Sequence, residues 1–382
     1  MYIAKSYLST FLKEYRLLIL CFVIWKISLL AISFLVQNFL PFNPTYPYSN
    51  ELISNYKHFF VYIWGGFDGV HYLNISQNGY ASQFTQAFLP TYPILIKIFT
   101  FGFIPPLYVG VLINNICFLA SLIVVKKVFT SMSISSNYKF FVILYFVFPT
   151  SFFFSAVYTE GLFLLLSVMV FYYFSKEKYF YTGLFGAIGS SVKLIGAFIF
   201  PVLIMSLVFV SLRKIKVSKN LFWLLIIPAG LIAYMVFLQI QFGDFLYFLH
   251  AQNYFGNARS SNFVLLPQVV FRYMKIFATV PIFTTMYFIS VLELLSAAFF
   301  ILIPLILYKK IPLNWLLYSL TIVVVPSLTG TFSSMPRYVL MSFPVFMLVS
   351  KLKPRYFYPI AFVLACLQVI LFSLFASGTF VA

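Results

Sequence analysis

Residues 17–40 read LLILCFVIWKISLLAISFLVQNFL, an apolar run of 24 residues with one charged side chain, Lys26. An α-helix rises about 1.5 Å per residue, so roughly 20 apolar residues cross the hydrocarbon core of a bilayer. Runs of roughly 17 to 25 residues recur along the chain, and 63% of its 382 residues are hydrophobic while 8% are charged. A soluble domain needs more polar surface than this. The sequence therefore predicts an all-α, polytopic integral membrane protein in which residues 1–382 form a single transmembrane domain.

The formal net charge is +18, from 25 basic and 7 acidic residues. The basic residues form short clusters between apolar runs rather than one basic face, so no nucleic-acid partner is predicted. The lipid bilayer is the expected surrounding, and loop lysines and arginines indicate which ends of the spans face the cytoplasm. Cys21, Cys117 and Cys366 lie far apart in apolar runs, so neither a disulfide nor a zinc site is predicted.

Basic clusters set the order of the predicted spans. Lys5, Lys13 and Arg16 precede the first run, which lacks a small-residue cleavage site and is predicted to be a retained span. With the N-terminus inside and the C-terminus outside, roughly eleven crossings are predicted. The segment 180–212 is predicted to form two short helices that meet near Lys193 and return to the basic cluster Arg213, Lys214, Lys216 and Lys219. The other crossing segments are 17–40, 105–125, 140–157, the descent to Lys176, 220–241, 284–308, 312–330, 337–350 and 356–379.

Two long outer loops, 41–85 and 242–283, are predicted between these spans. The proline-rich stretch 88–104 is predicted to form a short re-entrant or interfacial helix. Part of the second outer loop is expected to lie along the membrane surface, because its basic residues are interleaved with aromatic ones. Of the seven acidic residues only Glu14 and Glu177 fall inside, so chemistry is predicted on the outer face.

The most informative outer segment is WGGFDGVHYLNISQNGY, residues 64–80. If 68–77 is helical, Asp68 and His71 are three residues apart and share a face, with Tyr72 beside them. In that position the Asp68 carboxylate is a candidate catalytic base. The alternative interpretation is a solvated loop acid that caps a helix.

A second segment, FPTSFFFSAVYTEGLF at residues 148–163, places a polar Tyr-Thr-Glu triplet that ends at Glu160 between two apolar runs. Glu160 is a candidate substrate-binding residue, and a simple turn with a capping threonine is the alternative. Lys193 lies within an apolar helix pair, where a lysine either snorkels or meets an anion. A Gly- and Ser-rich break beside it favours phosphate contact, whereas snorkelling is favoured for Lys26.

Two further segments contribute one charged residue each. The segment FGDF, residues 242–245, opens the second outer loop, and its Asp244 is either a substrate-binding residue or part of an ordinary Gly-Asp turn. The segment SSMPRY, residues 333–338, puts Arg337 at the outer mouth of a short helix. Arg337 is there either a phosphate clamp or an interfacial anchor.

The order of these motifs resembles the GPI mannosyltransferase II family and its prokaryotic relatives, which belong to the GT-C glycosyltransferases. The resemblance spans nearly the whole chain, and no single motif would suffice for it. The five motifs are, in order, Asp68-x-x-His71-Tyr72 with Gly79-Tyr80, Phe88-Leu-Pro90-x-Tyr92-Pro93, the stretch from Pro149 to Tyr158-Thr159-Glu160, Phe242-Gly-Asp244, and Pro336-Arg337-Tyr338. The first and the third are the most specific.

The resemblance implies a GT-C-like bundle that moves a sugar, often mannose, with inversion from a dolichyl or polyprenyl phosphate donor to a glycan or glycolipid acceptor. It also implies a catalytic acid in the first outer loop, the position that Asp68 occupies. The family's segment usually reads Trp-Asp-x-x-His, whereas Gly-Gly-Phe separates Trp64 from Asp68 here. The sugar and the acceptor stay open. The candidate substrate-binding residues are His71, Tyr72, Glu160, Lys193, Asp244 and Arg337.

A separate chemical argument favours the same kind of donor. Sugar nucleotides are soluble and cytoplasmic, so a transferase whose acids face outward needs a sugar that is delivered through the membrane. Asp68 is then the predicted general base, while Arg337, Lys193 and, more weakly, His71 stabilise the departing lipid phosphate. No cofactor is predicted, and Mg or Mn dependence is left open. The expected location is the cell membrane of a prokaryote or the endoplasmic reticulum of a eukaryote, with the active site outside or lumenal.

The main alternative is a transporter or flippase of a lipid-linked saccharide, which also needs many helices and intramembrane charges. Transporters often carry internal repeats, and none is detected in this sequence. A structural membrane protein without chemistry is the third alternative, and it leaves Asp68 and Glu160 unexplained. Whether Asp68, Lys193 and Arg337 meet in one outward-facing pocket is the observation that discriminates among these alternatives.

Overall fold

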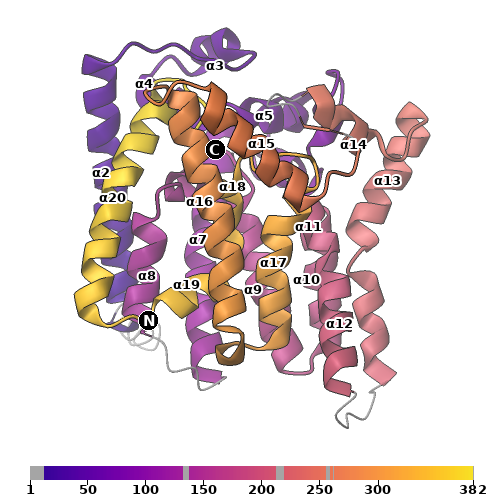
Figure 1. The fold of residues 1–382 in the computed structure, drawn as a ribbon. Helices are drawn as coiled ribbons and strands as arrows, with labels where there is room; N and C mark the ends of the chain where they lie inside the picture. The colour runs from indigo at the N-terminus through magenta and orange to yellow at the C-terminus, as the bar shows by residue number, and fades with distance from the viewer. Residues whose placement is uncertain (1–12, 132–136, 212–218, 255–258, 261, 382) are drawn as a thin grey trace, which may run out of the picture.

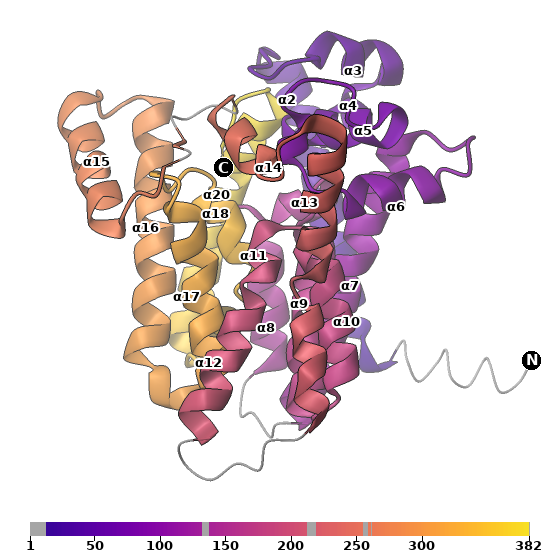
Figure 2. The same cartoon turned by 90° about the vertical axis from the view of Figure 1, so that its right-hand side faces the viewer.

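The computed structural model describes residues 13–131, 137–211, 219–254, 259–260 and 262–381, and every regular element in these residues is a helix (Figure 1). The helices run mostly along one direction and form a bundle, with shorter helices gathered at one end (Figures 1 and 2). In the described residues a large hydrophobic core extends through the bundle from Tyr15 to Val381, and a small separate cluster joins Leu89, Tyr234, Leu238 and Phe248. Four basic residues used to predict the topology, Lys5, Arg213, Lys214 and Lys216, lie outside the described residues.

Five helical segments are long and apolar enough to cross a membrane, judged by length and composition within the described residues. Between 22% and 44% of each apolar window is buried inside the bundle, so more than half of each window is exposed or only partly buried. Apolar side chains such as Ile24, Leu112 and Phe362 are exposed there, and a surface of this kind needs lipid around it. The protein therefore fits a multi-pass helical membrane protein, while the number of about eleven spans stays a prediction. The five segments are α2 (Arg16–Phe39), α7 (Pro106–Ser131), Asn220–Phe242 with η4 (Lys219–Ile226) and α13 (Ala229–Phe242), α16 (Thr285–Ile306) and α20 (Pro354–Ala376).

Shorter helices complete the bundle. Among them α9 packs between α7 and α10, and its residues from Glu160 to Leu164 are all buried. On the far side of α10, a Cβ at Gly230 would lie 2.0 Å from the Ala187 carbonyl oxygen, so only glycine allows α13 to approach so closely. The shorter helices are α8 (Tyr138–Val147), α9 (Glu160–Ser175), α10 (Tyr179–Ser190), α11 (Leu194–Ala197), α12 (Ile199–Ser211) and α17 (Leu313–Ser327).

Two of the predicted spans are wrong in form. The segment 140–157 is helical only to the end of α8, because Pro149 disfavours a helical residue before it, and the chain continues as the buried 3₁₀ turn η3 (Ser151–Ser155). The segment 337–350 is broken into α18 (Met335–Tyr338), η7 (Val339–Met341) and α19 (Phe343–Val349). Because α8, α16 and α17 all contact α19, this segment lies inside the protein rather than against lipid.

The predicted break in 180–212 is confirmed. Helix α10 ends at Ser190 and α11 begins at Leu194, so the residues between them interrupt the pair and leave Lys193 as the N-cap of α11. The predicted short helix in 88–104 is present as α6 (Thr91–Phe99). Its relation to the membrane stays a prediction.

The bundle has two distinct ends. At the first, the ion pair between Lys126 Nζ and Glu14 Oε1, 2.9 Å long, joins the end of α7 to the residues before α2; this is called the basic end. At the other, the Asn43 N–H donates to the Ser377 carbonyl oxygen at 2.9 Å, next to the ends of α2 and α20; this is called the loop end. Figure 1 shows several of the short helices of both long loops at the loop end. They are α3 (Ser49–Tyr56), α4 (Phe59–Tyr62), α5 (Asp68–Asn78), α14 (Tyr247–His250) and α15 (Leu266–Thr279).

Candidate functional site

A cavity of about 530 Å³ lies at the loop end, bordered by Thr45 and Phe380. Segments that are far apart in the sequence meet in its wall: the start of α5, the turn before α9, the break before α11, and the α17–α18 connection. Asp68, Lys193 and Arg337 all line it. These are the three residues whose meeting in one pocket distinguishes the transferase hypothesis from its alternatives, and they share one cavity. His71, Tyr72 and Glu160 border it as well.

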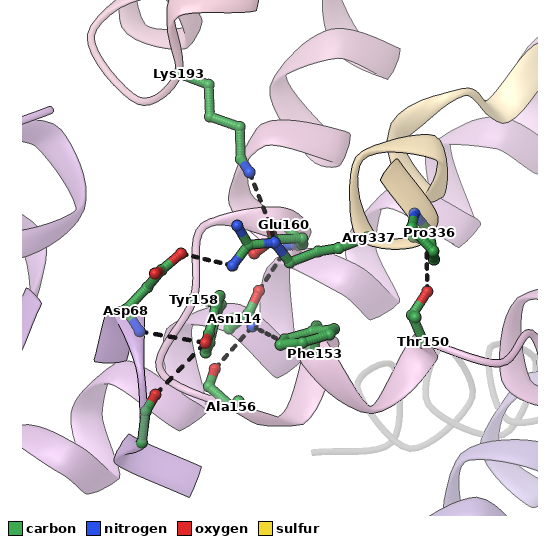
Figure 3. A network of polar contacts seen from close by, with 12 residues as sticks. Asp68, Asn114, Thr150, Phe153, Ala156, Tyr158, Glu160, Lys193, Pro336 and Arg337 are labelled. Carbon is green, nitrogen blue, oxygen red and sulfur yellow. Dashed lines mark hydrogen bonds and ion pairs between the residues drawn. The ribbon is translucent and has the colours of Figure 1, made fainter. Parts of the chain in front are cut away.

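Asp68 is held at the start of α5 with its carboxylate directed at Arg337. The Arg337 Nη1 to Asp68 Oδ2 distance is 2.5 Å (Figure 3), and the Asp68 side chain keeps 29% of its surface exposed. The backbone N–H of Asp68 donates to the Tyr158 hydroxyl at 3.3 Å. Asp68 is thus anchored by its backbone and paired through its side chain, and the simple capping interpretation does not describe it.

The residue before Asp68 has a strained backbone. Phe67 has φ +56°, a conformation that costs free energy for a bulky side chain. Its ring packs against Tyr46, with ring centroids 4.6 Å apart, and against Phe375 at 5.3 Å. These aromatic contacts stabilise the strained backbone at Phe67. The conformation of Phe67 sets where α5 begins and where the Asp68 side chain points.

Arg337 is enclosed by aromatic rings and by the turn that carries it. Its guanidinium lies 5.1 Å from the ring centroid of Tyr158 and 5.4 Å from that of Phe153, at distances typical of cation–π contacts. Next to it, the Thr150 hydroxyl donates to the Pro336 carbonyl oxygen at 2.6 Å (Figure 3). With 5% of its side-chain surface exposed, Arg337 has a fixed position from which it can hold an anionic group.

Glu160 lies between the two other charges of the site. Its Oε1 is 2.7 Å from Lys193 Nζ and 3.6 Å from Arg337 Nε (Figure 3). The Glu160 side chain is fully buried, yet it belongs to the wall of the cavity, where it lies against both cations; its substrate-binding role stays a prediction. The charges of Asp68, Arg337, Glu160 and Lys193 therefore alternate along one connected chain.

The turn before α9 is held by Asn114 of α7. The Asn114 amide donates to the carbonyl oxygens of Phe153 and Ala156 at 2.7 and 2.9 Å, and its oxygen accepts the Gly161 N–H at 2.7 Å (Figure 3). A Cβ at Gly161 would lie 2.3 Å from the Asn114 carbonyl oxygen, so glycine is needed there. Thr159, the N-cap of α9, makes no capping hydrogen bond with its side chain.

His71 and Tyr72 are on the face of α5 that the sequence predicted. The His71 ring stacks on Phe88 with centroids 4.8 Å apart, and Tyr72 meets the same ring edge-on at 5.1 Å. Burial lowers the pKa of His71 more than the Asp68 carboxylate raises it, which favours the neutral ring and agrees with His71 as the weaker of the phosphate-binding candidates.

Asp68 keeps its negative charge. Burial by itself would raise the pKa of Asp68, but the charge and hydrogen bond of Arg337, with smaller contributions from His71 and Arg259, hold this pKa below its usual value. Hydrogen bonds and opposite charges favour the ionised carboxylate in this way. At neutral pH the cavity therefore contains an ionised carboxylate that can accept a proton.

Asp244 is not brought to this cavity. Its Oδ1 accepts the Leu246 N–H at 2.9 Å and its Oδ2 lies 2.7 Å from His250 Nδ1, in a pair that is largely exposed. Gly243, at φ +74°, ends α13 directly before it. The local contacts match the ordinary Gly-Asp turn, so the prediction that Asp244 binds substrate in this site is not supported by its position.

Arg259 is the site residue that the sequence did not single out. It lines the cavity, and its Nη1 donates to the Gln252 side-chain oxygen at 2.8 Å. Among the described residues no carboxylate lies within ion-pair distance of Arg259. The cavity then holds three cations, from Lys193, Arg259 and Arg337, against two carboxylates, which leaves a net charge of +1. The sequence offered no periodic signal here, because Arg259 lies in an irregular part of the second outer loop.

Lys26 corrects another prediction. Its Nζ donates to the Ser155 hydroxyl at 2.6 Å and lies 5.5 Å from the Trp25 ring centroid and 5.6 Å from that of Trp64. The side chain therefore points into the bundle, and snorkelling to the membrane surface is wrong. Aromatic faces and one hydroxyl replace water around the ammonium group.

The described residues contain no group of three or more His, Cys, Asp or Glu side chains placed to hold a metal ion. Metal dependence stays open. No family model, curated protein or solved structure matches the chain. The resemblance to the GPI mannosyltransferase II family therefore rests on the quoted motifs and stays a prediction.

Proposed function

We propose that this protein is a GT-C type membrane glycosyltransferase that transfers a sugar, with mannose as the first candidate, from a polyprenyl or dolichyl phosphate donor. The observation that carries the proposal is the pairing of a partly exposed, ionised Asp68 with Arg337 in a cavity of net positive charge. A transferase of this class needs a base for the acceptor hydroxyl and cations for the departing phosphate. Both are present within one cavity.

The choice of donor follows from the proposed orientation. Loop lysines and arginines favour the cytoplasmic side, so we assign the basic end to the cytoplasm and the cavity to the outside or lumen. Soluble sugar nucleotides do not reach that side, whereas a polyprenyl phosphate sugar is carried there by its lipid. The apolar outer surface of the bundle is where such a lipid chain would run.

In the proposed step, the acceptor hydroxyl attacks the anomeric carbon as its proton passes to the Asp68 carboxylate. The new bond forms between the acceptor oxygen and the anomeric carbon, and the bond from that carbon to the phosphate oxygen breaks. The electron pair leaves with the lipid phosphate, and attack from the opposite face inverts the anomeric centre. Arg337, Lys193 and Arg259 supply the positive charge that stabilises the departing phosphate.

The experiment is a transfer assay with the purified full-length protein in lipid nanodiscs, given polyprenyl phosphate mannose and a panel of glycan and glycolipid acceptors. The wild type is expected to form product. The Asp68→Asn variant should fold but lose activity by about 10²-fold or more, because the amide cannot accept the proton. The matched control is Asp244→Asn, which removes a carboxylate of the same loop end that lies outside the cavity and should keep wild-type turnover.

Two outcomes contradict the proposal. Wild-type turnover in Asp68→Asn would remove the base. Absence of transfer together with movement of a lipid-linked saccharide across proteoliposomes would establish the transporter or flippase instead.

A further inference from the structure

Glu293 is an acidic residue in the interior that the proposed reaction does not use. It lies within the long apolar helix α16 and is 6% exposed. A carboxylate inside such a helix is costly and is retained mainly where it has a function. Glu293 lines a second cavity of about 430 Å³, which shares Thr45, Ser333 and Phe380 with the cavity of Asp68.

The contacts of Glu293 lead to the turn that carries Arg337. Its Oε1 accepts the backbone N–H of Ser334 at 3.2 Å, and its Oε2 accepts the Tyr273 hydroxyl at 2.5 Å. Ser334 has φ +66° and is the N-cap of α18, and its carbonyl oxygen accepts the Arg337 N–H at 3.1 Å. The carboxylate thus holds the residue from which the Arg337 turn begins, in a left-handed conformation that is unfavourable without such support.

The same turn is held from its other side. Thr150 donates to the Pro336 carbonyl oxygen (Figure 3), whereas Glu293 accepts from the Ser334 N–H. Thr150 is the N-cap of η3 and Glu293 belongs to α16, and the two side chains hold the peptide groups 333–334 and 336–337, before and after Met335. The position of the Arg337 guanidinium therefore depends on this turn, and the Ser334 N–H of the turn depends on Glu293 as its acceptor.

We infer that Glu293 is a positioning residue for Arg337 and that Tyr273 ties the surface helix α15 to it. Helix α15 lies beside α16 at the loop end (Figure 2). It exposes Phe271 and Met274, at 59% and 50%, and buries Tyr273 against Glu293. The packing of α15 against α16 is thereby linked, through the side chains of Tyr273 and Glu293, to Arg337, which pairs with Asp68.

The consequence for catalysis rests on the proposed function, so binding is measured separately from transfer. The probe is radiolabelled undecaprenyl phosphate, titrated against nanodisc-embedded wild type, Glu293→Ala, Glu293→Gln and Tyr273→Phe. Glu293→Ala should raise the dissociation constant about tenfold, as expected when a buried N–H loses its acceptor. Glu293→Gln should recover part of the affinity, because its amide oxygen still accepts from Ser334.

The matched control is Tyr287→Phe, which removes a phenol hydroxyl from the same α15–α16 contact, where Tyr287 faces Phe277 with centroids 5.4 Å apart. It should bind as the wild type does. If Glu293→Ala does not fold, Glu293→Gln and Tyr273→Phe carry the comparison with this control.

A double variant separates positioning from general stabilisation. If Glu293 acts through Arg337, adding Glu293→Ala to Arg337→Lys should weaken binding little beyond Arg337→Lys alone. Losses that multiply in the double variant, or wild-type binding in a folded Glu293→Ala, would overturn the inference. A wild type that binds the lipid phosphate but transfers no sugar contradicts the transferase proposal, while the ratios of dissociation constants still decide the role of Glu293.

Discussion

Two carboxylates at the loop end, Asp68 and Asp244, each pair with a basic residue but differ in what surrounds them. Asp68 pairs with Arg337, 269 residues away in the sequence, whereas Asp244 pairs with His250, six residues away. The first pair is embedded among aromatic rings and continues to Glu160 and Lys193, and the second is largely exposed. Charge pairs built from distant segments depend on the whole fold, and local pairs depend mainly on a turn.

The difference predicts how each pair responds to substitution. Removing one partner of a buried pair leaves an uncompensated charge and is strongly destabilising. An exposed pair is screened by water, and its loss has little effect. The predictions below follow this order, from the largest expected effect to the smallest.

The largest effect is expected at Glu160. Glu160→Ala removes the carboxylate between Lys193 and Arg337, so the free energy of unfolding should fall by about 3 to 5 kcal/mol. The measurement is thermal unfolding of the detergent-purified protein, with Asp244→Ala as the control of the same charge at the same end. If Glu160→Ala does not accumulate, Glu160→Gln keeps the size of the side chain and should still lower the unfolding temperature. Equal unfolding temperatures in Glu160→Gln and wild type would show that the charge chain does not stabilise the fold.

A smaller effect is expected in the pH dependence of transfer. Burial alone would raise the pKa of Asp68, but Arg337 holds this pKa below its usual value. Because the base is active when ionised, Asp68 should cause no decline of kcat/KM from about pH 8 to about pH 5. In Arg337→Gln the opposing charge is gone, and the acid limb of the profile should move upward by about 1 to 3 pH units.

The pH experiment also has a control. Asp244→Asn should leave the acid limb of the profile where the wild type has it. An Arg337→Gln variant that retains residual activity with an unshifted acid limb would mean that Asp68 is not the base whose ionisation limits the rate.

The fold was predictable where local chemistry decides it. The run 17–40, the helix that begins at Asp68 and the break before Lys193 follow from hydropathy and from Gly- and Ser-rich sequence. That the segment 337–350 is broken into short helices and buried among α8, α16 and α17 was not predictable, because composition does not distinguish an apolar helix facing lipid from one buried in protein. The direction of Lys26 was missed for a related reason, since its partner Ser155 is 129 residues away.

The site was predictable as a set of residues but not as a set of contacts. Motif order selected Asp68 and Arg337, the cost of a lysine within an apolar helix pair selected Lys193, and the three share a cavity. That Glu160 is fully buried between the two cations, and that Arg259 adds a third cation, depends on how distant segments pack. No spacing in the sequence carries that information.

The smallest effect is expected at His250, and it tests whether the second outer loop contributes to the site. His250→Ala removes the partner of Asp244, whose side chain is 35% exposed while that of His250 is 55% exposed, so the free energy of unfolding should change by less than about 1 kcal/mol. The KM for the donor and kcat should also match the wild type, because neither residue lines the cavity. Arg259→Gln provides the contrast: it removes a cation of the same loop that does line the cavity and should raise the donor KM. A raised donor KM in His250→Ala would place this local pair in the site and remove the distinction between the two carboxylates.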